Sequence, residues 1–213
     1  MDGNARWARQ NGLPVLEGHR EGARVLKRTI RDAKQLGIEQ LTVFAFSTEN
    51  WGRPSQEVSG LMEMFAELIE SEVPELHEER TRIRFVGKRD RISTKLLDRI
   101  EWAEGLTREH HERTLFVAFD YGGRAEILDA AAAYEGGGEE EFRRRLYAPD
   151  MGDPELVIRT SGEQRLSNFL LWQSAYSELY FSDKLWPEFD RAELERALAE
   201  YASRQRRFGG RTA

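Results

Sequence analysis

The chain has 213 residues, of which 33% are charged and 39% hydrophobic, and its formal net charge at pH 7 is −6. This length suits one large domain, and the negative charge gives no general attraction to nucleic acid or to an acidic membrane surface. Any anion site must therefore be a local cluster of basic side chains. The absence of cysteine excludes disulfides and Cys-ligated metal sites. With no visible secretory signal and no apolar run that could span a membrane, we expect a cytoplasmic protein.

Helical and strand patterns alternate along the chain. Apolar residues at helical spacing predict a helix over 19–36, and the continuous apolar run 41–46 predicts a strand buried on both faces. Pro54 is a suitable first residue for the next helix, which has a wide apolar stripe over 58–76. Further strands are expected at 83–86, 115–119 and 156–158, and further helices at 93–109, 123–134, 165–173 and 190–206.

This alternation predicts an α/β fold. We expect a mostly parallel central sheet with helices on both faces, in a single domain over residues 1–213. The segment 135–141, rich in glycine and glutamate, is expected to be a flexible surface loop. In such sheets a ligand binds beyond the carboxyl ends of the strands, so polar clusters that follow strands are candidate sites.

One polar cluster lies at residues 2–7, with the sequence Asp-Gly-Asn-Ala-Arg-Trp. Glycine lets the backbone come close to a phosphate, and amide groups that open a helix point at an anion. Arg6 can pair with phosphate oxygens and Asp2 can hold Mg²⁺, so the group suits a diphosphate with its metal. Ordinary turn chemistry is the alternative for these residue types.

Two more clusters follow predicted strands. The sequence Ser-Thr-Glu-Asn-Trp-Gly-Arg at 47–53 mixes polar, aromatic and cationic side chains, although a strand-to-helix loop with a solvated arginine would look the same. The segment 159–168 places two arginines and two serines around a glycine turn. Two arginines at a helix start suit a diphosphate, whereas an N-cap role for Ser167 or Asn168 is the alternative.

Glu178 stands in the otherwise apolar stretch 177–181, where a carboxylate should be paired or should ligate a metal. A buried salt bridge is the competing interpretation. Other kinds of site find no support in the sequence. The four histidines lack metal-ligand spacing, and there is no Walker or dinucleotide fingerprint and no nucleophile elbow.

Taken in order, these clusters resemble the cis-prenyltransferases, and in particular the undecaprenyl diphosphate synthases. The matching blocks run almost from end to end of the chain, and several are long and irregular. They are residues 1–8, Gly18-His19 with Gly22, 44–54, 121–124, 159–173, 178–181 with Trp186-Pro187, and 206–209. The resemblance implies condensation of isopentenyl diphosphate onto an allylic diphosphate such as farnesyl diphosphate, with each new double bond cis and Mg²⁺ as cofactor.

The resemblance also implies roles for single residues. Asp2 falls on the aspartate that holds Mg²⁺ and assists diphosphate departure, Asn50 on the residue that helps proton removal, and Glu178 on a second magnesium ligand. The family's cradle for the allylic diphosphate corresponds to Gly3, Asn4, Ala5 and Arg6, with Trp7 and His19 beside it. Its neighbouring substrate loop corresponds to Ser47, Thr48, Glu49, Trp51 and Arg53. Its isopentenyl diphosphate site corresponds to Arg159, Arg165 and Ser167, with Leu166 between the last two.

The family is homodimeric, so the resemblance implies a homodimer in which the arginine-rich tail reaches the partner's site. The apolar stretches 178–181 and 185–186 suit that interface. We expect no nucleic acid partner, and at most peripheral membrane contact through the lipid product. A short-chain synthase, a non-catalytic subunit of a heteromeric enzyme and a phosphate-binding protein without turnover are the alternatives.

Some positions depart from the family pattern. Ala5 stands where many members have Gly. Val15 stands where some members have an Arg that contacts phosphate, and Gln164 where some have a His near the metal. Phe119 is bulky and is expected to shorten the product tunnel. Family members usually carry an apolar strand ahead of Asp2. Without that strand we expect unpaired strand edges and a poorly fixed Asp2, so that the recorded start is not the natural one or the activity is low.

Overall fold

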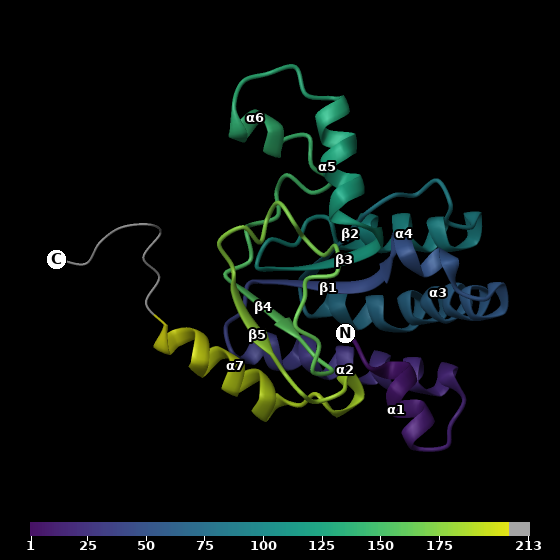
Figure 1. Ribbon diagram of the computed structural model, residues 1–213. Coiled ribbons are helices and arrows are strands. Elements are labelled where there is room, and N and C mark those ends of the chain that lie inside the picture. Colours follow the sequence, from purple (N-terminus) through teal and green to yellow (C-terminus); the bar gives the residue numbers. More distant parts are fainter. Residues whose placement is uncertain (205–213) are drawn as a thin grey trace.

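The computed structural model, shown in Figure 1, describes residues 1–204. The predicted match at 206–209 lies outside the described residues. The helices are α1 (Asn4–Gln10), α2 (Val15–Gln35), α3 (Ser55–Glu78), α4 (Thr94–Thr107), α5 (Gly123–Ala132), α6 (Glu139–Arg143) and α7 (Arg191–Ser203), with 3₁₀ turns η1 (Thr48–Gly52) and η2 (Trp186–Glu188). The strands are β1 (Gln40–Ser47), β2 (Thr81–Val86), β3 (Arg113–Tyr121), β4 (Leu156–Arg159) and β5 (Glu178–Phe181).

The long periodic segments of the sequence form the elements predicted for them. The patterns at 19–36, 41–46 and 58–76 become α2, β1 and α3. The helix predicted over 165–173 is wrong, because this segment forms turns. Ser167, Asn168 and Leu170 have φ values of 49°, 66° and 42°, which a right-handed helix cannot contain.

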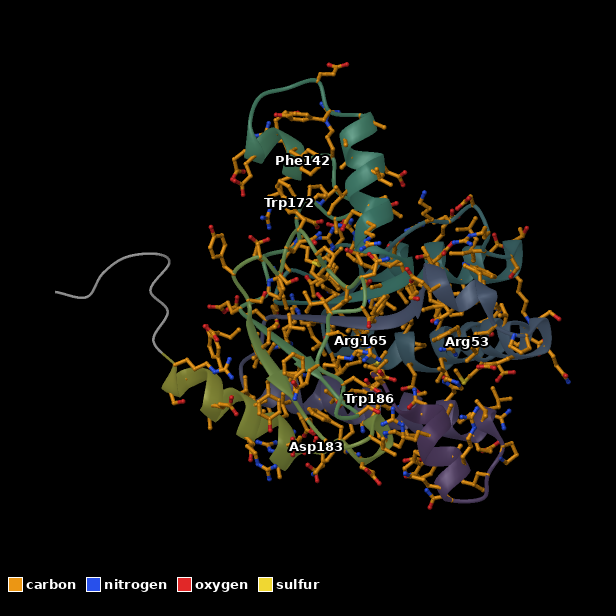
Figure 2. All side chains as sticks on the ribbon, in the orientation of Figure 1. Arg53, Phe142, Arg165, Trp172, Asp183 and Trp186 are labelled. Atoms are coloured by element: carbon orange, nitrogen blue, oxygen red, sulfur yellow. The ribbon has the colours of Figure 1, made fainter. Side chains whose placement is uncertain are left out.

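The segment predicted as a flexible loop at 135–141 contains the start of α6. Phe142 of α6 packs on Trp172, with ring centroids 4.5 Å apart (Figure 2). This aromatic contact attaches α6, which lies in the upper part of Figure 1, to the irregular segment that follows β4.

All strand pairs in the described residues are parallel. One sheet has the order β1-β3-β2, and β4 pairs with β5 in a second sheet. The α/β fold with parallel strands is therefore confirmed, but the expected single sheet is divided in two. Within residues 1–204, β1 and β4 each pair along one edge only, and both line a cavity of about 790 Å³.

The three-stranded sheet has a different cover on each face. Helices α3 and α4 pack on one face, through apolar side chains that include Leu61, Ile69 and Ile100. The other face packs on irregular segments at 147–151 and 169–170 rather than on a long helix. Within the described part of the chain, no helix combines the length and apolar character needed to cross a membrane.

Two helical glycines bring α1 onto α2. A Cβ at Gly18 would lie 2.2 Å from the backbone oxygen of Asn4, and one at Gly22 would lie 2.5 Å from the Asn4 side-chain oxygen. Glycine inside a helix costs about 1 kcal/mol relative to alanine, so this close approach has a clear structural cost. It holds the start of α1 against the first turns of α2.

Candidate active site

Asp2 is held by its backbone just beyond the carboxyl end of β4. Its N–H donates to Thr160 Oγ1 at 3.0 Å, while its carbonyl accepts from the Thr160 hydroxyl and the Trp186 N–H, each at 2.9 Å. Figure 2 places Trp186 close to where Figure 1 marks the N-terminus. The expectation of a poorly fixed Asp2 is therefore wrong for its backbone. The side chain is not part of this clamp and is 45% exposed.

Gly3 makes the turn from this clamp into α1. Its φ is +108°, and a Cβ there would come within 3.0 Å of the Leu185 and Ser161 side chains. Both observations require glycine. Helix α1 then begins at Asn4 without a side-chain cap, so the first amide groups of the helix have no capping partner.

Arg159, the last residue of β4, links the first and third sequence clusters. Its Nη2 donates to Asp2 Oδ2 at 3.0 Å, and its Nη1 donates to Ser167 Oγ at 2.7 Å and to the Arg165 carbonyl. The side chain is only 15% exposed. A single guanidinium thus orders both the carboxylate of Asp2 and the turn that carries Arg165 and Ser167.

Two further arginines share one carboxylate. Arg6 Nη2 lies 2.9 Å from one oxygen of Glu163, and Arg165 Nη1 lies 2.5 Å from the other. Hydrogen bonds from Arg6 and then Arg165 hold the pKa of Glu163 below its ordinary value. Arg6 also donates to the Ser161 carbonyl at 2.9 Å. The side chain of Arg165 is 60% exposed, so this arginine can exchange its partner for an anion.

Several buried polar atoms around these residues lack a hydrogen-bond partner among the described residues. They are Asn4 Oδ1, His19 Nε2, Arg159 Nε and Ser161 Oγ. Burial, and then the charge of Arg53, lower the pKa of His19, which favours its neutral imidazole. Buried polar groups without partners cost free energy, and their concentration here indicates a site that a polar ligand completes.

The second cluster forms a capped turn after β1. Asn50 Oδ1 accepts from the Ser47 N–H at 3.0 Å, and Glu49 accepts from the Ser47 hydroxyl at 2.8 Å and from Asn168 Nδ2 at 2.8 Å. Burial raises the pKa of Glu49, but the hydrogen bonds from Ser47, Asn168 and Thr48 outweigh it and hold that pKa below its usual value. Asn168 thereby ties the second cluster to the third.

Trp51 is fixed from two sides. Its indole N–H donates to Asp120 Oδ1 at 2.7 Å, and Arg91 Nη2 lies 2.7 Å from the same oxygen. The Arg91 guanidinium also lies over the indole, 5.1 Å from the ring centre. Asp120 is fully buried, with a φ of +47°. The carboxyl end of β3 thus holds the turn that carries Asn50.

An apolar cavity of about 220 Å³ opens beside the polar residues. Asn4, His19, Asn50 and Arg53 line one end of it, and apolar side chains of α2, α3 and the strands line the rest. Phe119 is not among the lining residues. It packs on Phe46 and Phe65, which do line the cavity, at centroid distances of 5.4 and 4.9 Å, so Phe119 does not face this space directly and its effect on the length of the product tunnel stays a prediction.

The polar clusters meet where two cavities adjoin. Asn50 lines both the apolar cavity and the larger cavity between the sheets, and the larger one also includes Asp2, Arg159 and residues 165–167. Figure 2 labels Arg165, from the loop after β4, and Arg53, which follows η1 just before α3. The predicted clusters therefore converge on one region.

Glu178 lies apart from them. It pairs with Leu156 at the start of β4, whereas Arg159 ends that strand. Its carboxylate is 2.7 Å from Arg204, which agrees with the salt-bridge alternative. Glu178 and Asp2 therefore lie at opposite ends of β4 within one chain, and the role of Glu178 as a second magnesium ligand stays a prediction. Among the described residues no group of three or more metal-binding side chains is found.

Asp2 alone is still consistent with magnesium. Mg²⁺ is commonly held by one or two carboxylates together with substrate phosphates and waters, and it does not need a cage of protein ligands. The Asp2 carboxylate is half-exposed and lies beside Arg159, where a diphosphate would supply the remaining oxygens. The donor set therefore fits a metal that arrives with its substrate.

Three residues of this region were not singled out as site residues from the sequence. Thr160 clamps Asp2, Glu163 joins the two arginines, and Asn168 joins the turns after β1 and β4. These polar residues do not occur at a spacing that would identify them as site residues from the sequence. The stretches expected to form an interface are largely internal, since Tyr180, Leu185 and Trp186 are at most 8% exposed in one chain.

Comparisons with known proteins agree with this geometry. A family profile described as "Putative undecaprenyl diphosphate synthase" matches residues 1–209. An isoprenyl transferase of Thermotoga maritima is 51% identical over 99% of this chain and 94% of its own length, and isoprenyl transferase 2 of Bradyrhizobium diazoefficiens is 47% identical over 100% and 89%.

Solved structures show the same similarity. Lavandulyl diphosphate synthase from Lavandula x intermedia, crystallised with dimethylallyl diphosphate, is 37% identical with a TM-score of 0.94 over 98% of this chain and 95% of its own. A probable undecaprenyl diphosphate synthase from Campylobacter jejuni is 31% identical, with a TM-score of 0.82 over 89% and 92%. The chain belongs to the undecaprenyl diphosphate synthase family of isoprenyl transferases, the cis-prenyltransferases.

Proposed function

We propose that this isoprenyl transferase condenses isopentenyl diphosphate onto an allylic diphosphate such as farnesyl diphosphate, with Mg²⁺ as cofactor, to give a cis-polyprenyl diphosphate. The observation that carries the substrate class is the set of arginines and unpaired buried polar atoms where the apolar cavity adjoins the larger cavity. The diphosphate head of such a molecule pairs with the arginines and the unpaired polar atoms, and its isoprenoid tail fills the apolar cavity.

The allylic diphosphate is assigned to the side formed by α1 and the start of α2. The uncapped amide groups after Gly3, the Arg6 guanidinium and the unpaired nitrogen of His19 supply donors for its oxygens. Asp2 holds the magnesium ion, which when bound neutralises part of the diphosphate charge. The allylic tail then enters the apolar cavity past Asn50.

Isopentenyl diphosphate is assigned to the turn after β4. Arg165 and Ser167 lie on this turn, and Arg159 donates hydrogen bonds to the Arg165 carbonyl and to Ser167 Oγ. The exposed Arg165 exchanges Glu163 for a diphosphate oxygen, which leaves Glu163 paired with Arg6. Because Arg159 touches both Asp2 and Ser167, it places the two diphosphates beside one another.

In the reaction a carbon–carbon bond forms between the isopentenyl unit and the allylic carbon, the allylic carbon–oxygen bond breaks with its electron pair going to the diphosphate, and the isopentenyl unit loses a proton to the oxygens of that departing diphosphate. Arg6 and Arg159 stabilise the negative charge on the departing diphosphate. Removal of one such donor costs on the order of 2.7–4 kcal/mol in other enzymes. Asn50 has its side-chain oxygen fixed by the Ser47 N–H, which suits it for assisting proton removal.

The whole chain, residues 1–213, is proposed to act as one catalytic domain in a homodimer, and its cytoplasmic location stays a prediction. The most exposed large apolar side chains of the described residues are Tyr176 and Leu128, at 74% and 69%. Static light scattering at micromolar protein checks the assembly. A mass near 24.7 kDa would contradict the dimer.

An assay with labelled isopentenyl diphosphate and farnesyl diphosphate, with Mg²⁺ and with a chelator, tests the function. We expect labelled extended product that requires both substrates and the metal. A non-catalytic subunit would give no product alone, and a phosphate-binding protein would bind the substrates without turnover. Replacement of the exposed Asp98 on α4 by Ala is the matched control for Asp2→Ala.

A further inference from the structure

Two helices carry opposite charges along one seam. The α2 side of the seam consists of Lys27, Arg31 and Lys34, and the α3 side of Glu72, Glu75 and Glu79. Each set recurs at helical spacing, so it forms one stripe along its helix. Every cation of the seam comes from one helix and every carboxylate from the other. We call these six residues the α2–α3 seam.

The contacts of the seam form one linked group of four residues and one separate pair. Lys27 Nζ lies 2.6 Å from Glu72 and 2.9 Å from Glu75, Arg31 also contacts Glu75, and Lys34 Nζ lies 3.4 Å from Glu79. The hydrogen bonds that Lys27 donates to Glu72 and Glu75 raise the pKa of Lys27, and those that Glu75 accepts from Arg31 and Lys27 lower the pKa of Glu75. Both helices are thus joined by charged groups at their carboxyl-terminal halves.

The seam also borders the apolar cavity. Lys27, Arg31 and all three glutamates line it together with apolar side chains such as Leu26 and Leu68. The catalytic residues lie at the other end, near the starts of α2 and α3. A tail that enters past Asn50 therefore grows toward the seam.

The cavity is small for a growing tail. Its volume of about 220 Å³ lies below the usual range for ligand pockets of roughly 300–1,000 Å³. A longer tail must therefore separate α2 from α3 or stop. Contact of an apolar tail with ion-paired side chains also removes water from charges, which is unfavourable.

Helix α3 has a weak point at this place. Pro74 lies inside the helix, between Glu72 and Glu75. Proline removes one backbone hydrogen bond and favours a kink, so the last turn of α3 depends more on its side-chain contacts. The ion pairs of Glu75 and Glu79 with α2 hold this turn in place.

From these observations we propose that the α2–α3 seam limits product length by closing the far end of the apolar cavity. The proposal rests on the proposed function, because it assumes that the isoprenoid tail occupies this cavity. The seam residues do not contact the diphosphates or the reacting atoms. They determine instead how long a tail the cavity accepts while α2 and α3 stay together.

Glu75→Gln tests the seam, because it removes a charge that pairs with both Lys27 and Arg31. The matched control is Glu70→Gln on the same helix, whose carboxylate pairs with Arg99 of α4 at 3.0 Å instead. Initial rates of isopentenyl diphosphate incorporation and product lengths are measured by chromatography. We expect the ratio of longer to main product to rise roughly threefold to tenfold in Glu75→Gln only, with initial rates unchanged.

A charge-swapped variant separates the seam from a general loosening of the fold. It combines Lys27→Glu and Arg31→Glu with Glu72→Lys and Glu75→Lys, which restores opposite charges with their order reversed. We expect it to recover the product distribution of the unchanged chain. Equal distributions in Glu75→Gln and Glu70→Gln, or no recovery in the swapped variant, would overturn the proposal.

Binding measurements do not depend on turnover. Titration with geranyl, farnesyl and geranylgeranyl diphosphate gives the affinity as a function of tail length. Glu75→Gln should favour the longest of these roughly threefold more than Glu70→Gln does. Binding without turnover in every variant would reject the proposed function alone, whereas identical length dependence in both variants would reject the seam proposal.

Discussion

The two ends of the apolar cavity differ in how their polar groups are satisfied. At the catalytic end, Asn4, His19, Arg159 and Ser161 keep buried atoms without partners in the described part of the chain. At the seam end, each charged side chain lies within ion-pair distance of an opposite charge on the neighbouring helix, and only Glu79 Oε2, 3.4 Å from Lys34, is buried there without a hydrogen bond among the described residues. Unpaired buried groups are unfavourable until a ligand binds, whereas ion pairs join two elements without one.

Backbone conformation differs in the same way. The segments around the catalytic end include positive φ values at Gly3, Asp120, Ser161, Ser167 and Asn168. The seam residues lie on α2, on α3 and at the C-cap of α3, and none of them has a positive φ, although Pro74 interrupts the hydrogen bonding of α3. Sparsely populated backbone conformations concentrate at functional sites, where the surrounding structure holds them. The difference indicates a preorganised binding end and an end that closes by side-chain contacts.

Loss of the Asp2 carboxylate should give the largest effect. Asp2→Ala is expected to lower kcat by roughly a hundredfold to a thousandfold, because the diphosphate loses the carboxylate that holds its metal. The backbone clamp by Thr160 and Trp186 does not use this side chain, so the melting temperature should stay close to that of Asp98→Ala. Turnover within tenfold of the unchanged chain would contradict the metal role.

The turn after β4 should affect one substrate more than the other. Arg165→Ala is expected to weaken isopentenyl diphosphate binding by roughly tenfold to a hundredfold, since it removes a hydrogen bond between charged groups. Ser167→Ala should have a smaller effect, because a neutral hydroxyl gives a weaker bond. Separate titrations of the two substrates measure this. Equal losses for both substrates in Arg165→Ala would mean that the sites are assigned wrongly.

The regular elements could be predicted because their patterns are long. The run at 41–46 and the stripe at 58–76 each have one physical interpretation, and the structure confirms both as β1 and α3. The apolar run at 169–172 resembled a helix, but polar contacts around Asn168 hold the chain in left-handed conformations there. Local pattern cannot reveal such tertiary contacts.

Site residues could be predicted from the sequence only where the side chain itself suits a metal or a diphosphate. Asp2, Arg6 and Arg159 could be named because carboxylates and arginines suit a metal and a diphosphate, and the resemblance gave them roles. Thr160 and Asp120 have no such signal, since each acts through a residue distant in sequence. Glu178 was assigned to the metal, yet only the register of β4 and β5 shows which end of the sheet it occupies.

Asp120 offers a test of preorganisation at the catalytic end. Asp120→Ala is expected to lower kcat roughly tenfold, because Trp51 loses its acceptor and the neighbouring Asn50 shifts. Asp120→Asn keeps an acceptor for the indole N–H and tolerates the positive φ, so it should recover most of kcat. Comparable kcat in the Ala and Asn variants would show that Asp120 is structural and does not position the turn.

Lowering the pH should weaken the ion pairs of the α2–α3 seam, and we expect this effect to be smaller than those of the Asp2, Arg165 and Asp120 substitutions. Hydrogen bonds from Arg31 and Lys27 lower the pKa of Glu75 below its ordinary value of 4.5. A carboxylate with a lowered pKa stabilises the folded state above that ordinary value, and this stabilisation is lost as the pH falls through the lowered pKa.

The melting temperatures of the unchanged chain and of Glu75→Gln should therefore differ by at most about 3 °C near neutral pH, since exposed ion pairs contribute little. This difference should stay constant down to about pH 5 and shrink below about pH 4, as Glu75 becomes neutral in the unchanged chain too. Thermal unfolding followed by circular dichroism measures it. A difference that grows on acidification would mean that the charge of Glu75 opposes the closed helix pair, and the contrast between the two ends of the cavity would then fail.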